Sequence, residues 1–271
     1  MPLKQLEDFF THKISFNEYI TGNRFIDICS RGHATFCKTD YIEEYTGSAH
    51  KTFVTHNSDY HIDKNRFNLR PKGLTKWYCQ NKDYQTDKLR AIPIGLENMT
   101  LRINSTSQSG RFSSEPPDGL KKAIYINKLS EEETVHGDLV YLNVNPNTFR
   151  SERAHVLNHF SSNDWVTRQA ALPWQDYYRQ IASHKFVFSP RGNGTDCHRT
   201  WEALYLRTIP IIKRSAAMNE FNDLPILFVD DWGEINCDFL YKKYEEMTSK
   251  LFDLSNMKIS YWEKQINGDF F

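Results

Sequence analysis

The chain has 271 residues, which is enough for two units that each bury a hydrophobic core. Its 34 lysines and arginines equal its 34 aspartates and glutamates in number, so bulk charge does not attract nucleic acid, and anions can bind only in a local basic pocket. The sequence contains no apolar stretch of membrane-spanning length, no signal peptide and no close cysteine pair, so we expect a cytoplasmic protein without disulfides or a zinc knuckle.

Residues 1–97 are typical of an α/β domain, because apolar runs bounded by turn residues alternate with segments that suit helices, such as 39–47. The runs predicted as strands are 24–30 (RFIDICS), 51–57 (KTFVTHN), 76–81 (KWYCQN) and 89–95 (LRAIPIG). Residues 98–118 are rich in serine, glycine, proline and asparagine and show no sustained period, which predicts a long loop between two domains.

Residues 119–250 predict a second α/β domain in which strands and helices alternate. The predicted strands are 138–144, 165–169, 185–190, 208–213 and 226–231, and the predicted helices are 151–160, 174–183 and 195–206. This alternation favours a mostly parallel sheet covered on both faces. The amphipathic stretch 239–265 is expected to lead back to the first domain, which residues 251–271 would complete.

One loop of this second domain combines glycine with charged residues. In an open α/β sheet, ligands bind beyond the carboxyl ends of the strands, and the strand 185–190 delivers this loop to that edge. Two glycines permit unusual backbone angles, and a threonine or an aspartate can cap the next helix, whose first amides then face an anion such as phosphate. The candidate anion-binding residues of the loop are Arg191, Gly192, Asn193, Gly194, Thr195 and Asp196.

The helix that follows places Arg199 and Glu202 three residues apart and therefore on one face, whereas Trp201, Leu204 and Tyr205 point toward the core. An arginine near a helix start can pair with a diphosphate, and a carboxylate one turn later can accept both hydroxyls of a ribose. The alternative is a solvated ion pair next to a simple turn. The loop has neither the Walker sequence nor the third glycine of the dinucleotide fingerprint.

The segment 186–212 (FVFSPRGNGTDCHRTWEALYLRTIPII) resembles the donor-binding segment of exostosin-like glycosyltransferases of family 47, in which a Pro-Arg-Gly loop leads into an Arg-x-x-Glu-Ala helix. The segments 53–59 and 77–98 resemble soluble members of this kind from bacteria and large algal viruses, and the resemblance spans about residues 50 to 235. The chain departs from the family in being short, in lacking the membrane anchor of animal exostosins, and in having Arg207 where the pattern usually has glycine.

The resemblance implies a GT-B fold, in which two Rossmann-like domains face one another across a cleft. It implies an inverting, metal-independent transferase that moves a sugar such as xylose from a UDP-sugar to a glycan acceptor, with no cofactor. Such enzymes build capsid or cell-surface glycans, and a viral member would work in the host cytoplasm. The alternatives are a GDP-sugar-dependent enzyme such as a fucosyltransferase and a glycan-binding protein of the same fold without turnover.

Further candidates follow the first strand of the second domain, where several side chains that donate hydrogen bonds are expected at the edge of the sheet. Asn145 and Arg153 are assigned to the diphosphate or the sugar. The alternative for Asn147 and Thr148 is an Asx turn and a helix cap. Trp174, Tyr177 and Tyr178 can stack on a sugar or base, although core packing is the preferred interpretation.

The acceptor side of the first domain must supply a base that takes the proton of the acceptor hydroxyl. Asp59 is the first choice and His33 the second, and turn capping or an ordinary surface position is the alternative for each. Three neighbours, His56, Asn57 and His61, are expected at the same edge. A metal at His56 to His61 is not favoured, and Asp230 and Asp231 are interpreted as the end of a strand rather than a cation site.

Overall fold

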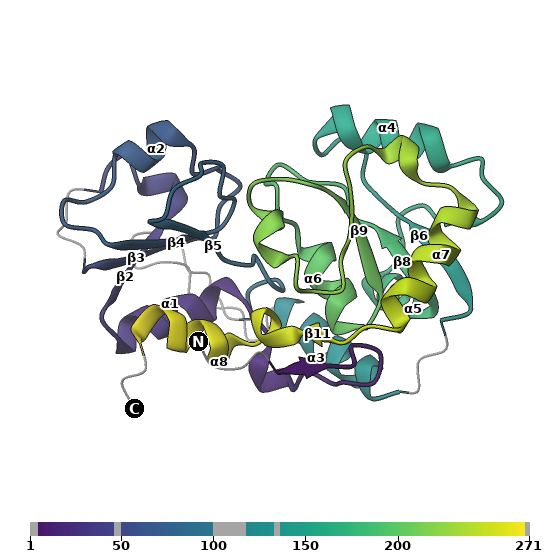
Figure 1. The fold of residues 1–271 in the computed structure, drawn as a ribbon, viewed down its shortest axis with the longest axis horizontal. Helices are drawn as coiled ribbons and strands as arrows, with labels where there is room; N and C mark the ends of the chain where they lie inside the picture. The colour runs from purple at the N-terminus through teal and green to yellow at the C-terminus, as the bar shows by residue number, and fades with distance from the viewer. Residues whose placement is uncertain (1–4, 46–49, 100–117, 133–135, 269–271) are drawn as a thin grey trace.

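The computed structural model describes residues 5–45, 50–99, 118–132 and 136–268, and this part of the chain contains two larger, wholly parallel β-sheets (Figure 1). The sheet of the N-terminal half has the strand order β2-β3-β4-β5. Helices α1 and α8 lie on one face of this sheet and α2 on the other. The bounds are α1 (Gly22–Arg31), β2 (Ala34–Lys38), β3 (Thr52–His56), α2 (Lys64–Asn68), β4 (Lys76–Cys79), β5 (Leu89–Ala91) and α8 (Ile259–Asn267).

The second sheet has the order β10-β9-β8-β6-β7, again with every adjacent pair parallel. Helices α4 and α7 cover the face that carries Phe186 and Phe188, and α3, α5 and α6 cover the other face. The parallel sheet covered on both faces is therefore confirmed. The bounds are α3 (Asp118–Glu131), β6 (Asp138–Leu142), α4 (Arg150–Phe160), β7 (Val166–Arg168), α5 (Trp174–Ser183), β8 (His184–Phe188), α6 (His198–Tyr205), β9 (Ile209–Lys213), β10 (Leu227–Val229) and α7 (Cys237–Thr248).

The strand predicted at 24–30 is wrong, because these residues form α1. Phe25, Ile28 and Cys29 are buried at spacings of three and one, which is the pattern of a helix face, and the Thr21 hydroxyl accepts a hydrogen bond from the amide of Arg24 at the helix start. The first strand of this sheet along the chain is instead β2. The helix predicted at 39–47 is reduced to a 3-10 turn at Thr39–Tyr41, and its last two residues lie outside the described part.

One main hydrophobic core extends from α1 and the first sheet into the second sheet, and a smaller core lies beneath α2. Successive residues of a strand point to opposite faces, so Val54 and Tyr78 join the main core while Phe53 and Trp77 join the smaller one. Because the main core includes residues of both sheets, it holds the loops of one sheet against those of the other.

The chain returns to its N-terminal half after α7 (Figure 1). Strand β11 (Phe252–Asp253) pairs antiparallel with β1 (Leu6–Glu7), and α8 then packs on α1. The Tyr78 hydroxyl donates to the carbonyl of Gln265 over 2.7 Å, which ties β4 to α8. Most of the loop predicted at 98–118 lies outside the described residues. Within the described residues, none of the helices has the length and apolar character needed to cross a membrane.

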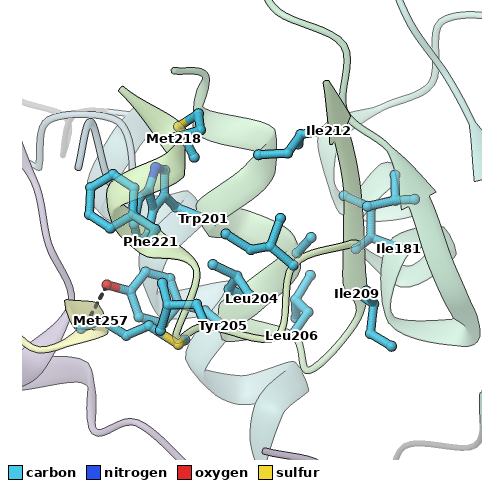
Figure 2. Packing of buried hydrophobic residues seen from close by; sticks show 14 of the residues in the cluster. Ile181, Trp201, Leu204, Tyr205, Leu206, Ile209, Ile212, Met218, Phe221 and Met257 are labelled. Atoms are coloured by element: carbon cyan, nitrogen blue, oxygen red, sulfur yellow. Dashed lines mark hydrogen bonds between the residues drawn. The ribbon is translucent and has the colours of Figure 1, made fainter. Parts of the chain in front are cut away.

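The inner face of α6 is fully buried, as predicted for Trp201, Leu204 and Tyr205, and Figure 2 shows these side chains packed among Phe221, Ile209 and their neighbours. The helix ends in a Schellman arrangement, in which the amide of Thr208 donates to the carbonyl of Ala203.

Arg207 occupies the left-handed position of this helix end, with φ 61°, where glycine is usually favoured. Its guanidinium donates to the carbonyls of Phe10, Ser130 and Glu132 at 3.1 to 3.2 Å. These hydrogen bonds to carbonyls from two other segments offset the strain of a side chain at this position.

Candidate functional site

The carboxyl edges of the two sheets meet at two loops, one following β3 and one following β8. The Nε2 atom of His61 lies 2.8 Å from the Thr195 hydroxyl, and the Asn193 amide donates to the Asp59 carboxylate over 3.3 Å. The structure therefore brings the candidate base Asp59 next to the Arg-Gly-Asn-Gly loop. Ligands of parallel α/β sheets bind at this edge.

The position of the β8 loop depends on Asn81, which is buried just after β4 with φ 56°. Its amide oxygen accepts from the amide of Asp196, and its amide nitrogen donates to the carbonyl of Ser58, each over 3.0 Å. Gly194 packs directly on this side chain, and a Cβ atom at that position would lie 2.6 Å from Nδ2 of Asn81. Gly194 is thus required by close packing between the two loops.

Gly194→Ala is expected to lower the free energy of unfolding by roughly 1–3 kcal/mol, the usual range for overpacking a filled site. The added methyl group must displace Asn81 and break its two hydrogen bonds. Chemical denaturation measures the loss. Gly137→Ala is the matched control, because nothing lies within 4 Å of its added Cβ. An equal effect in both variants would contradict the role assigned to Gly194.

Asp196 is buried, joins the two halves of the chain through hydrogen bonds, and does not cap α6. Its Oδ2 atom accepts from the amide of Ile94 over 2.7 Å, and the Trp201 indole donates to Oδ1 over 2.8 Å. Helix α6 begins with Cys197 as its N-cap, which makes no side-chain capping bond, so the cap predicted for Thr195 or Asp196 is wrong. With both oxygens occupied and only 3% of the residue exposed, Asp196 supports the loop rather than contacting a donor sugar.

Burial raises the pKa of Asp196 from 3.8 to about 7. Between these values the folded state keeps a proton that the unfolded state has released, so this group makes folding less favourable as the pH rises from about 4 to about 7. The expected slope is up to about 1.4 kcal/mol per pH unit. Asp196→Asn is expected to flatten the pH dependence of unfolding, whereas exposed Asp164→Asn should leave it unchanged. The same slope in Asp196→Asn and in the wild type would contradict this assignment.

Three arginines converge at the edge of β6 and β8. The Nε atom of buried Arg153 donates to the carbonyl of Arg191 over 2.8 Å, and Arg199 donates to the carbonyl of Asn143 over 2.8 Å and to the Tyr177 hydroxyl over 3.0 Å. The Nη1 atom of Arg199 is buried and has no hydrogen-bond partner among the described residues. Burial, and secondly the nearby Arg199, lower the pKa of Arg153. The cluster has positive charge and donor capacity left over for an anion.

Gly192 and Arg191 complete this cluster. A Cβ atom at Gly192 would lie 3.3 Å from Nη2 of Arg153, so the glycine allows the guanidinium to approach the loop. The guanidinium of Arg191 stacks on the ring of Phe149 at 4.1 Å and donates to Nε2 of His61 over 2.9 Å. Phe149 itself has φ 46°, a strained backbone for an aromatic residue and one that often accompanies function.

Glu202 lies on the same helix face as Arg199, with Tyr177 between them. The Tyr178 hydroxyl donates to Oε1 of Glu202 over 2.8 Å, and the Tyr177 hydroxyl donates to Oε2 over 3.3 Å. Burial raises the pKa of both tyrosines, which keeps them protonated as donors. The pair is therefore not the solvated ion pair of the alternative interpretation. Each carboxylate oxygen keeps a second lone pair that can accept from a ligand.

No family model matches this chain, and no curated protein is significantly similar to it. The resemblance to exostosin-like glycosyltransferases thus stays a hypothesis that depends on the segments 53–59, 77–98 and 186–212. The proposed function therefore depends on the geometry of the two sheet edges.

Two cavities open at these edges. One, of about 330 Å³, lies over the first sheet and is lined by polar residues that include Asp40, Asp59 and His198. The other, of about 370 Å³, lies over the second sheet and is lined by Arg191, Lys213 and other residues. The first is here called the acceptor-side cavity, because it lies over the sheet for which the sequence predicts an acceptor. Arg153, Arg199 and Glu202 line neither cavity. His61 and Thr195, which are 2.8 Å apart, both line the second cavity.

His33 and Asn145 are two of the predicted site residues that line neither cavity. His33 is exposed and precedes β2, so it lies at the amino edge of the first sheet, opposite the site. The predicted position of His33 after a strand was wrong, because residues 24–30 form a helix. His33 therefore comes directly before the first residue of β2. Asn145 is exposed, and its side chain accepts from the amide of Asn147 over 3.0 Å, which is an Asx turn.

The histidines of the β3 loop are held by other groups. His56 is buried with Nε2 3.0 Å from the carbonyl of Pro93, and burial lowers its pKa to about 4. Burial, followed by the charge of Arg191, lowers the pKa of His61. Since a guanidinium only donates, Nε2 of His61 carries a lone pair and its ring is neutral. His61 therefore joins the two loops as a hydrogen-bond acceptor.

The metal alternatives receive no support from the part of the chain that the structure describes, where no group of three or more His, Cys, Asp and Glu side chains is arranged to hold an ion. Asp231 caps a short 3-10 turn after β10, and Asp230 pairs with Arg214 at 3.4 Å. Both aspartates thus end a strand, as interpreted from the sequence.

Proposed function

We propose that the protein is an inverting glycosyltransferase that moves a sugar from a nucleotide sugar to a hydroxyl of a glycan acceptor. The observation that carries the proposal is the cluster of Arg153, Arg191 and Arg199, in which a buried guanidinium nitrogen has no hydrogen-bond partner within the described part of the chain. Cations with unused donors at the carboxyl edge of a parallel sheet suit a diphosphate. The buried carboxylate of Glu202 on the same helix suits the ribose hydroxyls.

The contact between the carboxyl edges supports a GT-B arrangement, in which the second sheet holds the nucleotide sugar and the first holds the acceptor. The donor would lie along the arginines and the first turn of α6, and the acceptor in the acceptor-side cavity beside Asp59. Attack by the acceptor hydroxyl on the anomeric carbon moves negative charge onto the departing diphosphate. The arginines and helix amides are placed to stabilise that charge, so this scheme requires no divalent ion and no cofactor.

The arginines and Glu202 are assigned to the diphosphate and the ribose and would not distinguish the base, so UDP- and GDP-sugars both fit the proposal, and the UDP-sugar follows from the family resemblance. Calorimetry against both sets of nucleotide sugars tests binding. Incubation without acceptor then tests chemistry, because a transferase releases free sugar slowly, whereas a glycan-binding protein of the same fold does not. Transfer is expected to persist in a chelator, and complete loss in EDTA that manganese restores would contradict the metal-independent scheme.

A further inference from the structure

His198 belongs to the second half of the chain but lines the acceptor-side cavity, which lies over the first sheet. It opens α6, immediately before Arg199, and its side chain forms part of that cavity, whose other lining residues come from the first half of the chain. A proton acceptor for glycosyl transfer must approach the acceptor hydroxyl while the diphosphate is held nearby. His198 occupies the junction between those two places.

The hydrogen bond of the His198 ring fixes its tautomer. The Nδ1 atom lies 2.7 Å from the carbonyl oxygen of Gly95, and a carbonyl only accepts, so Nδ1 carries a hydrogen and the lone pair of the neutral ring is on Nε2. No described residue makes a hydrogen bond to Nε2. His198 is thus a residue of the cavity wall whose Nε2 atom has no hydrogen-bond partner among the described residues.

The backbone that orients the ring is itself tightly packed. Gly95 has φ 67°, and a Cβ atom there would lie 2.2 Å from the carbonyl oxygen of Ile20. The next amide, that of Leu96, donates to the same carbonyl over 2.8 Å. The Gly95 carbonyl is thus held in place, and with it the direction in which Nε2 of His198 points. Such preorganisation favours a group that must meet a substrate atom.

The other charged and titratable groups facing this cavity are less suited to take the proton. Lys38 and Asp40 form an ion pair at 3.2 Å. His56 is buried and already bonded at Nε2 to the Pro93 carbonyl. Asp59 is exposed, and its Oδ2 atom accepts from the side chain of Asn193. Of these described groups, His198 is the one whose ring is held by a backbone carbonyl while its other nitrogen has no partner.

We propose that Nε2 of His198 is the general base that takes the proton of the acceptor hydroxyl, and that the acceptor-side cavity binds a neutral, hydroxyl-rich sugar. This assignment rests on the proposed function. The acceptor oxygen forms a bond to the anomeric carbon, the bond from that carbon to the diphosphate oxygen breaks, and its electron pair leaves with the diphosphate. The proton moves to His198, and Asp59 orients the acceptor.

His198→Asn is the sharpest test, because the asparagine amide nitrogen can keep the bond to Gly95 while the Nε2 lone pair is lost. Transfer by this variant is expected to fall roughly a hundredfold to ten-thousandfold, the usual effect of removing a general base, with donor affinity from calorimetry unchanged. His198→Ala should regain part of its rate when imidazole is added. Exposed His159→Gln on α4 is the matched control and should behave as wild type.

Asp59→Asn separates the two candidates, and it is expected to raise the acceptor KM more than it lowers kcat. A His198→Asn enzyme that transfers at the wild-type rate, or one that remains active while Asp59→Asn is inactive, would overturn the assignment and leave the proposed function standing. A wild-type protein that binds nucleotide sugars but releases and transfers no sugar would overturn both. Thermal unfolding of each variant verifies that the fold is retained.

Discussion

Arg199→Gln is expected to lower kcat/KM for sugar transfer by roughly a hundredfold to a thousandfold, the range measured when one donor to a developing oxyanion is removed. Arg199 is the arginine whose buried Nη1 atom has no partner among the residues that the structure describes, and its other nitrogens donate to Tyr177 and Asn143. The guanidinium is therefore preorganised, and a bound diphosphate would supply the missing acceptor. Steady-state kinetics with a saturating acceptor, together with calorimetry for the nucleotide, measure the loss.

The control for this change is Arg179→Gln, which removes an exposed arginine that donates to the Tyr125 hydroxyl on the neighbouring helix face. It should leave transfer unchanged. Arg199→Lys keeps the charge but loses the planar fork, so an intermediate loss is expected. Because removing Arg199 also relieves its repulsion of Arg153, the variant should remain folded. Wild-type nucleotide affinity in folded Arg199→Gln would remove the arginine cluster from the donor site.

The fold of the second half was predicted from the sequence because its strands are short apolar runs separated by clear helical segments. The first half was harder, because an apolar run of seven residues such as 24–30 fits a strand or a helix face equally well. The structure has a helix here, because this conformation buries Phe25, Ile28 and Cys29 together against the first sheet. That single error also reversed the sheet edge to which His33 was assigned.

The sequence predicts most directly those candidate-site residues that are close to one another in the chain. The two glycines of the loop from Arg191 to Gly194 and the three-residue spacing of Arg199 and Glu202 can be recognised within one short segment. Their partners come from distant segments, as with Gly95 for His198 and Asn81 for Gly194, and such contacts have no local pattern. Tyr177 was recognised as an aromatic residue of α5, but its hydroxyl bridge to Glu202 depends on how two helices pack.

Glu202→Gln is expected to weaken nucleotide binding by about 1–3 kcal/mol, which corresponds to roughly five- to 150-fold in affinity, because a buried charged acceptor is replaced by a neutral amide. The carboxylate already accepts from Tyr177 and Tyr178, so the ribose would add to a network that holds it in place. Comparing UDP with 2′-deoxy-UDP in calorimetry isolates the ribose contribution. The wild type should prefer the ribonucleotide, and Glu202→Gln should lose that preference.

Tyr178→Phe tests whether such an effect comes from the carboxylate or from general loosening of the α5 and α6 contact. This variant removes the 2.8 Å hydrogen bond to Oε1 but keeps the charge of Glu202. It should be less stable than the wild type, by about 1 kcal/mol or somewhat more for a lost bond to a charged group, and yet keep the preference for ribose. If Tyr178→Phe and Glu202→Gln lose the preference equally, the carboxylate acts only as a packing element. If neither variant loses it, the ribose binds elsewhere and Glu202 serves the fold alone.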